Sequence, residues 1–187
     1  MTTPCTRFHR VISQALLMIF LAMAPAAADP IHDAALDGDT DLITALLEAG
    51  VDIEARTEIG ETPLHGAAGN DHSKAITTLL EAGAEINARN QYGGTPLHTA
   101  ARYGKSNAII TLLEAGADLK ARAAYGWTPL HIAANYGHSE AIITLLDAGA
   151  DPKAETDGYS LAIDFIAETS PAYETEAHQR LHDATYN

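Results

Sequence analysis

An eight-residue segment occurs three times in this chain at a constant spacing. Its copies read Glu-Thr-Pro-Leu-His-Gly-Ala-Ala, Gly-Thr-Pro-Leu-His-Thr-Ala-Ala and Trp-Thr-Pro-Leu-His-Ile-Ala-Ala, and they begin at Glu61, Gly94 and Trp127. Each start lies 33 positions after the one before it. A period of this length predicts helical units that cannot bury an apolar face alone and therefore stack into a solenoid, whose surface is a binding platform.

Each of these units also closes in the same way, with Leu-Leu, an acidic residue and Ala-Gly-Ala, beginning at Leu79, Leu112 and Leu145. Thr-Pro-Leu-His-x-Ala at this period is the signature of the ankyrin repeat, which the sequence therefore resembles. The resemblance implies an all-α fold, an ankyrin-repeat solenoid of helix-turn-helix units joined by β-hairpin-like fingers.

The resemblance covers residues 29–187. We expect one domain of about five repeats near residues 29–56, 57–89, 90–122 and 123–154, with a C-terminal cap at 155–187. The first unit has Asp29 in place of Thr. In the last unit Gly158 arrives one residue earlier than the period requires, and the unit lacks Pro and His. Degenerate ends are typical of solenoids, because terminal repeats present a polar outer face.

Each Thr-Pro pair predicts a helix start, with Thr as the N-cap that accepts a backbone N–H and Pro at the first helical position. Leu64, Ala67 and Ala68, with their equivalents, are spaced to face inward. Glycines are expected to end the second helices in the left-handed conformation at Gly83, Gly116 and Gly149. Three others are expected as the turn glycines of the fingers, namely Gly60, Gly93 and Gly126.

The first 28 residues differ from the rest of the chain. Arg7, His9 and Arg10 precede an apolar run over residues 11–24, which Pro-Ala-Ala-Ala follows. This pattern is typical of a secretory signal peptide, and we expect cleavage after Ala28. The alternative is a permanent membrane anchor, but the run is shorter than the ~20 residues of a spanning helix. The sequence therefore predicts a periplasmic or secreted protein with no membrane association after cleavage.

The charge of the chain excludes some partners. Its formal net charge is −14, and removal of Arg7 and Arg10 with the signal peptide makes it −16. Nucleic acids and anionic membranes are bound by Lys and Arg, so neither is expected as a partner. The single cysteine, Cys5, is lost in the same cleavage, and no disulfide is expected.

Three histidine or carboxylate patterns suggest metal sites, and each has a more ordinary interpretation. The evenly spaced His32, His65, His98 and His131 lie about one repeat apart, which is too far for them to share an ion. The stretch from Asp37 to Glu48 begins and ends like a calcium loop but has Leu42 where Gly is required. His178 and His182, with Glu174, have metal-compatible spacing but no fourth ligand. We therefore expect neither a metal nor a cofactor.

The repeats differ from one another at the fingers and at the exposed side of the first helix, where a partner would be recognised. Several of these differences are aromatic or Arg, the residue types that dominate interface hot spots. We expect a partner-binding surface on the concave side of repeats three to five, formed by Tyr92, Arg102, Tyr103, Tyr125, Trp127, Asn135, Tyr136 and Tyr159. Arg56, Arg89 and Arg122 recur at the finger bases. The alternative is that the tyrosines pack sideways on neighbouring fingers and make the stack rigid.

No nucleophile with a base, catalytic carboxylate pair or metal centre stands outside positions that the repeat explains, so we expect no enzyme activity. The function predicted is that of a monomeric, non-enzymatic module that binds a protein partner. Two other functions stay open. One is an accessory or inhibitory subunit of a periplasmic enzyme, for example one that removes peroxide, as the resemblance to exported bacterial ankyrin proteins implies. The other is a metal- or haem-handling protein.

Overall fold

The computed structural model describes residues 29–166, 171–173 and 175–186. The predicted signal peptide, residues 1–28, lies outside this part. The described residues form helices and no strands, which confirms the predicted all-helical fold. The α-helices are α2 (Pro30–Asp37), α3 (Thr40–Glu48), α4 (Pro63–Gly69), α5 (Ser73–Glu81), α6 (Pro96–Arg102), α7 (Ser106–Glu114), α8 (Pro129–Asn135), α9 (Ser139–Asp147) and α10 (Glu176–Tyr186). Two short 3₁₀ helices are η1 (Ala124–Gly126) and η2 (Ala162–Phe165).

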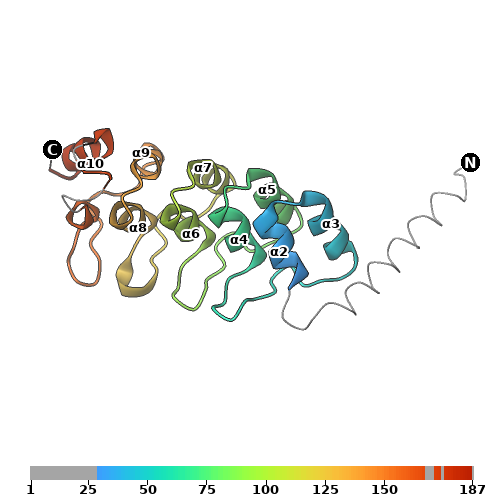
Figure 1. The fold of residues 1–187 in the computed structure, drawn as a ribbon. Coiled ribbons are helices and arrows are strands. Elements are labelled where there is room, and N and C mark those ends of the chain that lie inside the picture. Colours follow the sequence, from blue (N-terminus) through green and yellow to red (C-terminus); the bar gives the residue numbers. More distant parts are fainter. Residues whose placement is uncertain (1–28, 167–170, 174, 187) are drawn as a thin grey trace, which may run out of the picture.

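The helices form two rows along an elongated array (Figure 1). The first helices of the units, α2, α4, α6 and α8, each contact the next, and η2 continues this row. The second helices, α3, α5, α7 and α9, form the other row, which α10 extends. Long fingers between the helix pairs project from one edge of the array (Figure 1). This arrangement is the predicted solenoid.

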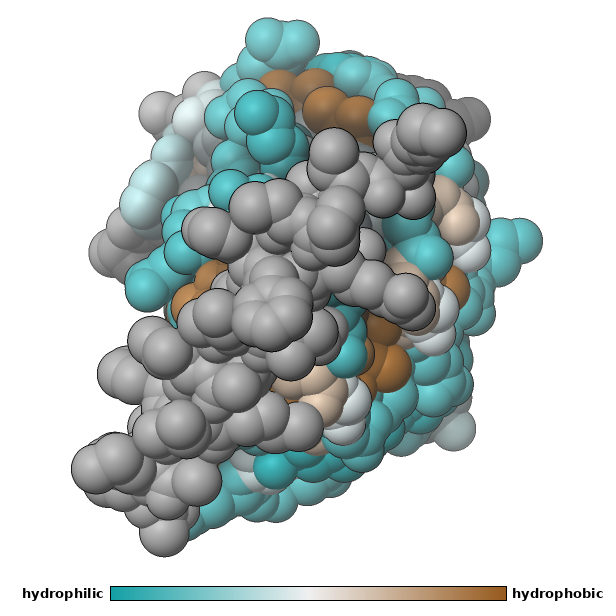
Figure 2. All heavy atoms as spheres, turned by 90° about the vertical axis from the view of Figure 1, so that its right-hand side faces the viewer, coloured by the Kyte–Doolittle hydropathy of each residue, from teal (hydrophilic) through white to brown (hydrophobic). Residues whose placement is uncertain are grey.

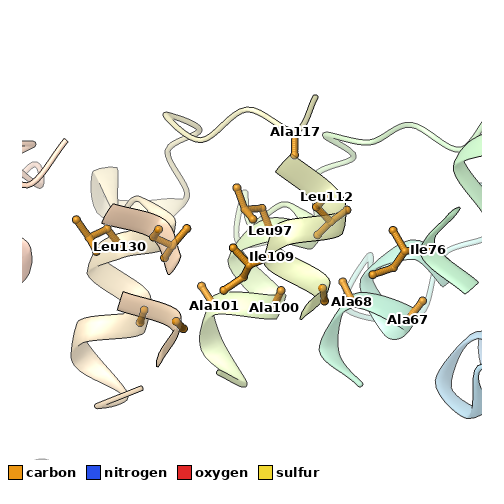
Figure 3. Packing of buried hydrophobic residues seen from close by; sticks show 14 of the residues in the cluster. Ala67, Ala68, Ile76, Leu97, Ala100, Ala101, Ile109, Leu112, Ala117 and Leu130 are labelled. Carbon is orange, nitrogen blue, oxygen red and sulfur yellow. The ribbon is translucent and has the colours of Figure 1, made fainter. Parts of the chain in front are cut away.

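The hydrophobic core lies between the two rows of helices. Its large side chains, no more than 1% exposed, are leucines and isoleucines of both rows, including Leu64, Leu97 and Leu130 of the first helices and Ile76, Leu79, Ile109, Leu112, Ile142 and Leu145 of the second helices. The paired alanines of α4 and α6 are fully buried and let successive helices approach closely (Figure 3). Seen from the end formed by α2 and α3, hydrophilic residues cover most of the described periphery, with hydrophobic residues between them (Figure 2).

The helix starts have the predicted threonine N-caps, and a histidine completes a capping box at each of them. The Thr128 hydroxyl accepts the backbone N–H of His131 at 3.5 Å. In the other direction, the backbone N–H of Thr62 donates to Nδ1 of His65 at 3.2 Å, and the Thr62 hydroxyl lies 2.9 Å from the same nitrogen. The later units repeat this pair. The prediction named the threonine alone, whereas the histidine ring also reaches back over one turn to accept at the helix start.

Each finger is a hairpin-like turn, as predicted. The backbone N–H of Asn90 donates to the carbonyl of Gly94 at 2.9 Å, and the Gly93 N–H donates to the carbonyl of Asn90 at 2.9 Å. The expected turn glycines all have positive φ, between 70° and 76°. The glycines that end the second helices also have positive φ, as predicted: Gly83, Gly116 and Gly149.

The last finger keeps the 33-residue register, and the predicted one-residue shift at Gly158 is wrong. The N–H of Thr156 donates to the carbonyl of Ser160 at 2.9 Å, as the equivalent residues do in earlier fingers. Tyr159 therefore occupies the position of the turn glycine, with φ of 60°. Asp164 stands where the histidine of the repeat would be, and its carboxylate accepts the N–H of Leu161 at 2.8 Å. Tyr159 thus preserves the backbone geometry of the finger turn, and Asp164 preserves the hydrogen bond at the helix start, although neither residue matches the repeat motif.

One residue joins two repeats through a helix start. Asp71 has a positive φ of 65° in the turn between α4 and α5, where the neighbouring units have glycine. Its carboxylate accepts from the backbone N–H of Ala108 at 2.7 Å and from the side-chain amide of Asn107 at 2.8 Å. A carboxylate at the N-terminus of α7 satisfies a backbone donor that has no partner within the helix. The strained backbone at Asp71 therefore supports a stabilising contact between repeats.

Candidate protein-binding surface

The finger tips carry a line of exposed apolar and aromatic side chains, which we call the tip row: Ile59, Tyr92, Tyr125 and Tyr159. All four are exposed, and Tyr125 and Tyr159 are 79% and 83% exposed. Side chains this accessible make few contacts within the repeat array. The alternative that these two tyrosines stabilise the stack by sideways packing therefore has little support.

The backbone beneath the tip row is rigidly connected from finger to finger. The N–H of Gln91 donates to the carbonyl of Ile59 at 3.1 Å, and that of Ala124 donates to the carbonyl of Tyr92 at 2.8 Å. The Asp157 N–H continues the series to the carbonyl of Tyr125 at 3.0 Å. A preorganised surface loses less conformational freedom when it binds a partner.

The arginines at the finger bases have a structural role. The guanidinium of Arg56 donates to the carbonyl of Arg89 at 2.7 Å. In the same way Arg89 donates to the carbonyl of Arg122, and Arg122 donates to that of Glu155. These contacts tie each finger to the next, so we do not count this arginine row as part of the binding surface.

Two tyrosines of the tip row occupy a backbone conformation that normally favours glycine. Tyr125 and Tyr159 both have φ of 60°. A bulky residue in this region is uncommon and costs of order 1 kcal/mol or more. Because both side chains extend into solvent, packing within the array does not offset this cost. Because strained residues cluster at functional sites, Tyr125 and Tyr159 are candidates for a binding role.

A second group of predicted residues lies at the C-terminal ends of α6 and α8, and we call it the helix-exit cluster: Arg102, Tyr103, Asn135 and Tyr136. All four side chains are exposed. The Arg102 guanidinium carbon is 5.9 Å from the ring centre of Tyr103 and 5.4 Å from that of Tyr136. The guanidinium therefore joins two tyrosines of successive repeats into one patch.

His138 contacts two members of this cluster, Tyr136 and Arg102. Its ring is nearly parallel to that of Tyr136, with centres 6.3 Å apart, and its Nε2 donates to the carbonyl of Arg102 at 2.9 Å. Sequence reasoning missed His138. The sequence signal was that the second repeat has a histidine, His72, at the same position in the period.

Trp127 is less exposed than the tyrosines of the fingers. The indole is partly buried, and its centre lies 4.6 Å from that of Phe165 in the last unit. Its carbonyl also accepts a hydrogen bond from Nε2 of His98 at 3.0 Å. We therefore assign Trp127 to the joint between the fourth repeat and the C-terminal unit, because a large apolar ring beside another is removed from water.

The histidine row has its ring nitrogens engaged by the protein. Nε2 of His65 donates to the carbonyl of Gly94 at 3.1 Å, while Nδ1 accepts at its own helix start. His32, His98 and His131 make the corresponding bond to the next finger. Burial lowers the pKa of His65 and of His98 from 6.5 to about 4, against the opposing effect of these hydrogen bonds, and also lowers the pKa of His131. The lowered pKa values keep His65, His98 and His131 uncharged at neutral pH, and the hydrogen bonds to the fingers give the whole row a structural role.

The other metal patterns have similar explanations. Asp39 accepts the N–H of Leu42 at 3.0 Å and so caps α3. His178 stacks on Tyr173 with ring centres 5.0 Å apart, while Glu174 lies outside the described residues. In the described part of the chain, no group of three or more His, Cys, Asp or Glu is placed to hold a metal ion. The same part contains no helix that is long and apolar enough to cross a membrane.

Comparison with known families identifies the class of protein that this fold defines. The family model described as ankyrin repeats (3 copies) matches residues 31–123 and 85–156. The chain therefore belongs to the ankyrin repeat family. Ankyrin repeats are in general scaffolds for protein–protein interaction rather than catalysts. A search of curated proteins found no match to the chain.

Proposed function

We propose that the chain is a non-enzymatic module that binds a protein partner through the tip row and the helix-exit cluster. The observation that carries this proposal is the exposed, strained pair Tyr125 and Tyr159 on a hydrogen-bonded finger edge. Tyrosine combines a large apolar area with a polar end, and interface hot spots are enriched in it. A protein is favoured over a small molecule, because small ligands bind in enclosed pockets.

We further propose that the protein acts outside the cytoplasm, in the periplasm or after secretion, as a monomer. The support for export is the pattern of residues 1–28. The same surface would also serve an accessory or inhibitory subunit of a periplasmic enzyme. In that case the protein captured by the tip row would itself be an enzyme, and its activity would change on binding.

The exported protein is expected to begin at Asp29, because Ala26 and Ala28 occupy the small-residue positions of a cleavage site. Intact mass and N-terminal sequencing of the exported form measure this directly. A product that retains residues 1–28 in the membrane fraction would show an anchor instead.

Tyr125→Ala is expected to weaken partner binding by ~2 kcal/mol or more, as central hot-spot residues do. Stability should not fall, since the side chain is 79% exposed and its φ is positive. Trp127→Ala should weaken binding less and reduce stability, since it removes the contact with Phe165.

The experiment is capture from periplasmic extract, analysed by mass spectrometry, with wild type, Tyr125→Ala and the control Ile110→Ala. Ile110 is an exposed apolar residue of α7, in the second row of helices. We expect the control to retain the partner and Tyr125→Ala to lose it. Identical capture by all three folded proteins would refute the assignment of the tip row.

A further inference from the structure

A groove lies across the first helices of repeats one to three, apart from the tip row. It has a volume of about 320 Å³. Its lining includes Leu36 of α2, Gly66 and Gly69 of α4, and Tyr103 of α6. Leu36 and Tyr103 are 45% and 54% exposed, so apolar surface remains accessible on both sides. The groove is continuous with the helix-exit cluster, because Tyr103 belongs to both.

The groove exists because α4 lacks side chains that the other first helices carry. Position 66 is Gly, whereas the equivalent positions of α6 and α8 are Thr99 and Ile132. A Cβ atom at Gly66 would lie 3.4 Å from the Leu36 side chain, which is ordinary contact, so one added methyl group would fit here and a longer side chain would extend into the groove. At Gly69 a Cβ would lie 3.3 Å from the Tyr103 ring. Gly69 therefore makes room for that ring, and Gly66 leaves space open.

Charged side chains border this groove. Glu61 lines it, and Asp33 lies one turn before Leu36 on the same face of α2. Lys105 also lines it. An apolar side chain placed between Leu36 and Tyr103 would thus lie in a groove that Glu61 borders. Opposite charge across an interface fixes the orientation of a partner.

We propose that this groove holds one large apolar side chain of a partner protein, with an adjacent Lys or Arg of the same segment placed against Asp33 and Glu61. The formal charge of −16 over residues 29–187 favours such a cationic segment. The proposal rests on the proposed function, since it specifies what a protein partner must present, and it adds to the helix-exit cluster a site formed by Leu36, Gly66 and Gly69.

The test uses NMR titration of the ¹⁵N-labelled protein, residues 29–187, with three synthetic peptides that differ at two central positions. The two positions hold Leu-Lys in the first peptide, Leu-Glu in the second and Ser-Lys in the third. The rest of each peptide is the same Gly-Ser sequence. The Leu-Lys peptide should shift the amide signals of Gly66, Gly69 and Asn70 in a saturable way. The other two peptides should bind at least about tenfold more weakly, because each removes either the buried apolar group or the charge pairing. Equal binding of all three, or no saturable shift at these amides up to about 1 mM peptide, would overturn the proposal.

A variant that fills the groove provides a second, independent test. Gly66→Ile copies Ile132, the equivalent residue of repeat four, and should reduce binding of the Leu-Lys peptide at least about tenfold while the array stays folded. Thr77→Ile adds an apolar side chain on the exposed face of α5 and should leave binding unchanged. Peptide binding that survives in Gly66→Ile would refute the groove. Tyr125→Ala tests the tip row separately, so failure of one site can be told from failure of the other.

Discussion

Leu97→Ala should reduce the free energy of unfolding by ~2 to 5 kcal/mol, because it empties a site in the middle of the stack. Leu97 is 1% exposed on α6, and this helix packs against both α4 and α8. The surrounding helices cannot collapse into the space from either side without losing their own contacts. In a solenoid, such a loss weakens two interfaces between repeats at once.

The matched comparison is Ile163→Ala in the last unit. Ile163 lies 66 positions after Leu97, in the same register, but it is 9% exposed and belongs to the terminal unit. Its truncation should cost less than that of Leu97. Urea unfolding followed by circular dichroism measures both losses. Equal losses would contradict the description of residues 155–166 as a terminal unit.

The free energy of unfolding should also fall steeply as the pH drops from about 6.5 to about 4. In the folded protein the pKa values of His65 and His98 are about 4, whereas the ordinary value is 6.5. Between these values the unfolded chain binds protons at both residues and the folded chain does not. The stabilisation is therefore complete above pH 6.5 and is lost towards pH 4, with a slope of about 1.4 kcal/mol per pH unit for each histidine.

The control is His98→Gln. A glutamine at this position can still accept the N–H of Thr95, as in a capping box, but it does not titrate. The variant should be less stable at pH 7, because the bond to the carbonyl of Trp127 is lost. The slope of its free energy of unfolding against pH should be smaller by the contribution of one histidine. Urea midpoints from pH 4.5 to 7.5 give the slope. An unchanged slope would show that other groups cause the acid sensitivity.

The repeat predicted the fold because each unit supplies the same contacts to its neighbours. Leu64, Leu97 and Leu130 are buried alike, since the environment of one is reproduced by the next. The same logic correctly placed the turn glycines. Position within the period therefore fixed burial and backbone conformation without knowledge of long-range topology.

The errors arose where a residue type was replaced but its geometry was kept. Tyr159 holds the glycine position at positive φ, and Asp164 replaces the histidine at the helix start. Neither substitution is visible in a motif, because backbone register is maintained by main-chain hydrogen bonds. The packing of Trp127 was missed for a related reason, since its contact with Phe165 joins residues 38 positions apart. The groove at Gly66 was not predicted, because it results from a missing side chain and not from a recognisable residue type.

We propose that the tip row binds the partner while the helices maintain the fold. The most direct test is the triple variant Tyr92→Ser, Tyr125→Ser and Tyr159→Ser, with the dissociation constant for the captured partner and the urea midpoint measured on the same sample. We expect the dissociation constant to rise at least about a hundredfold, because several hot-spot residues are lost together. The urea midpoint should be no lower than that of wild type. Unchanged affinity, or affinity lost only in proportion to a lower midpoint, would contradict it.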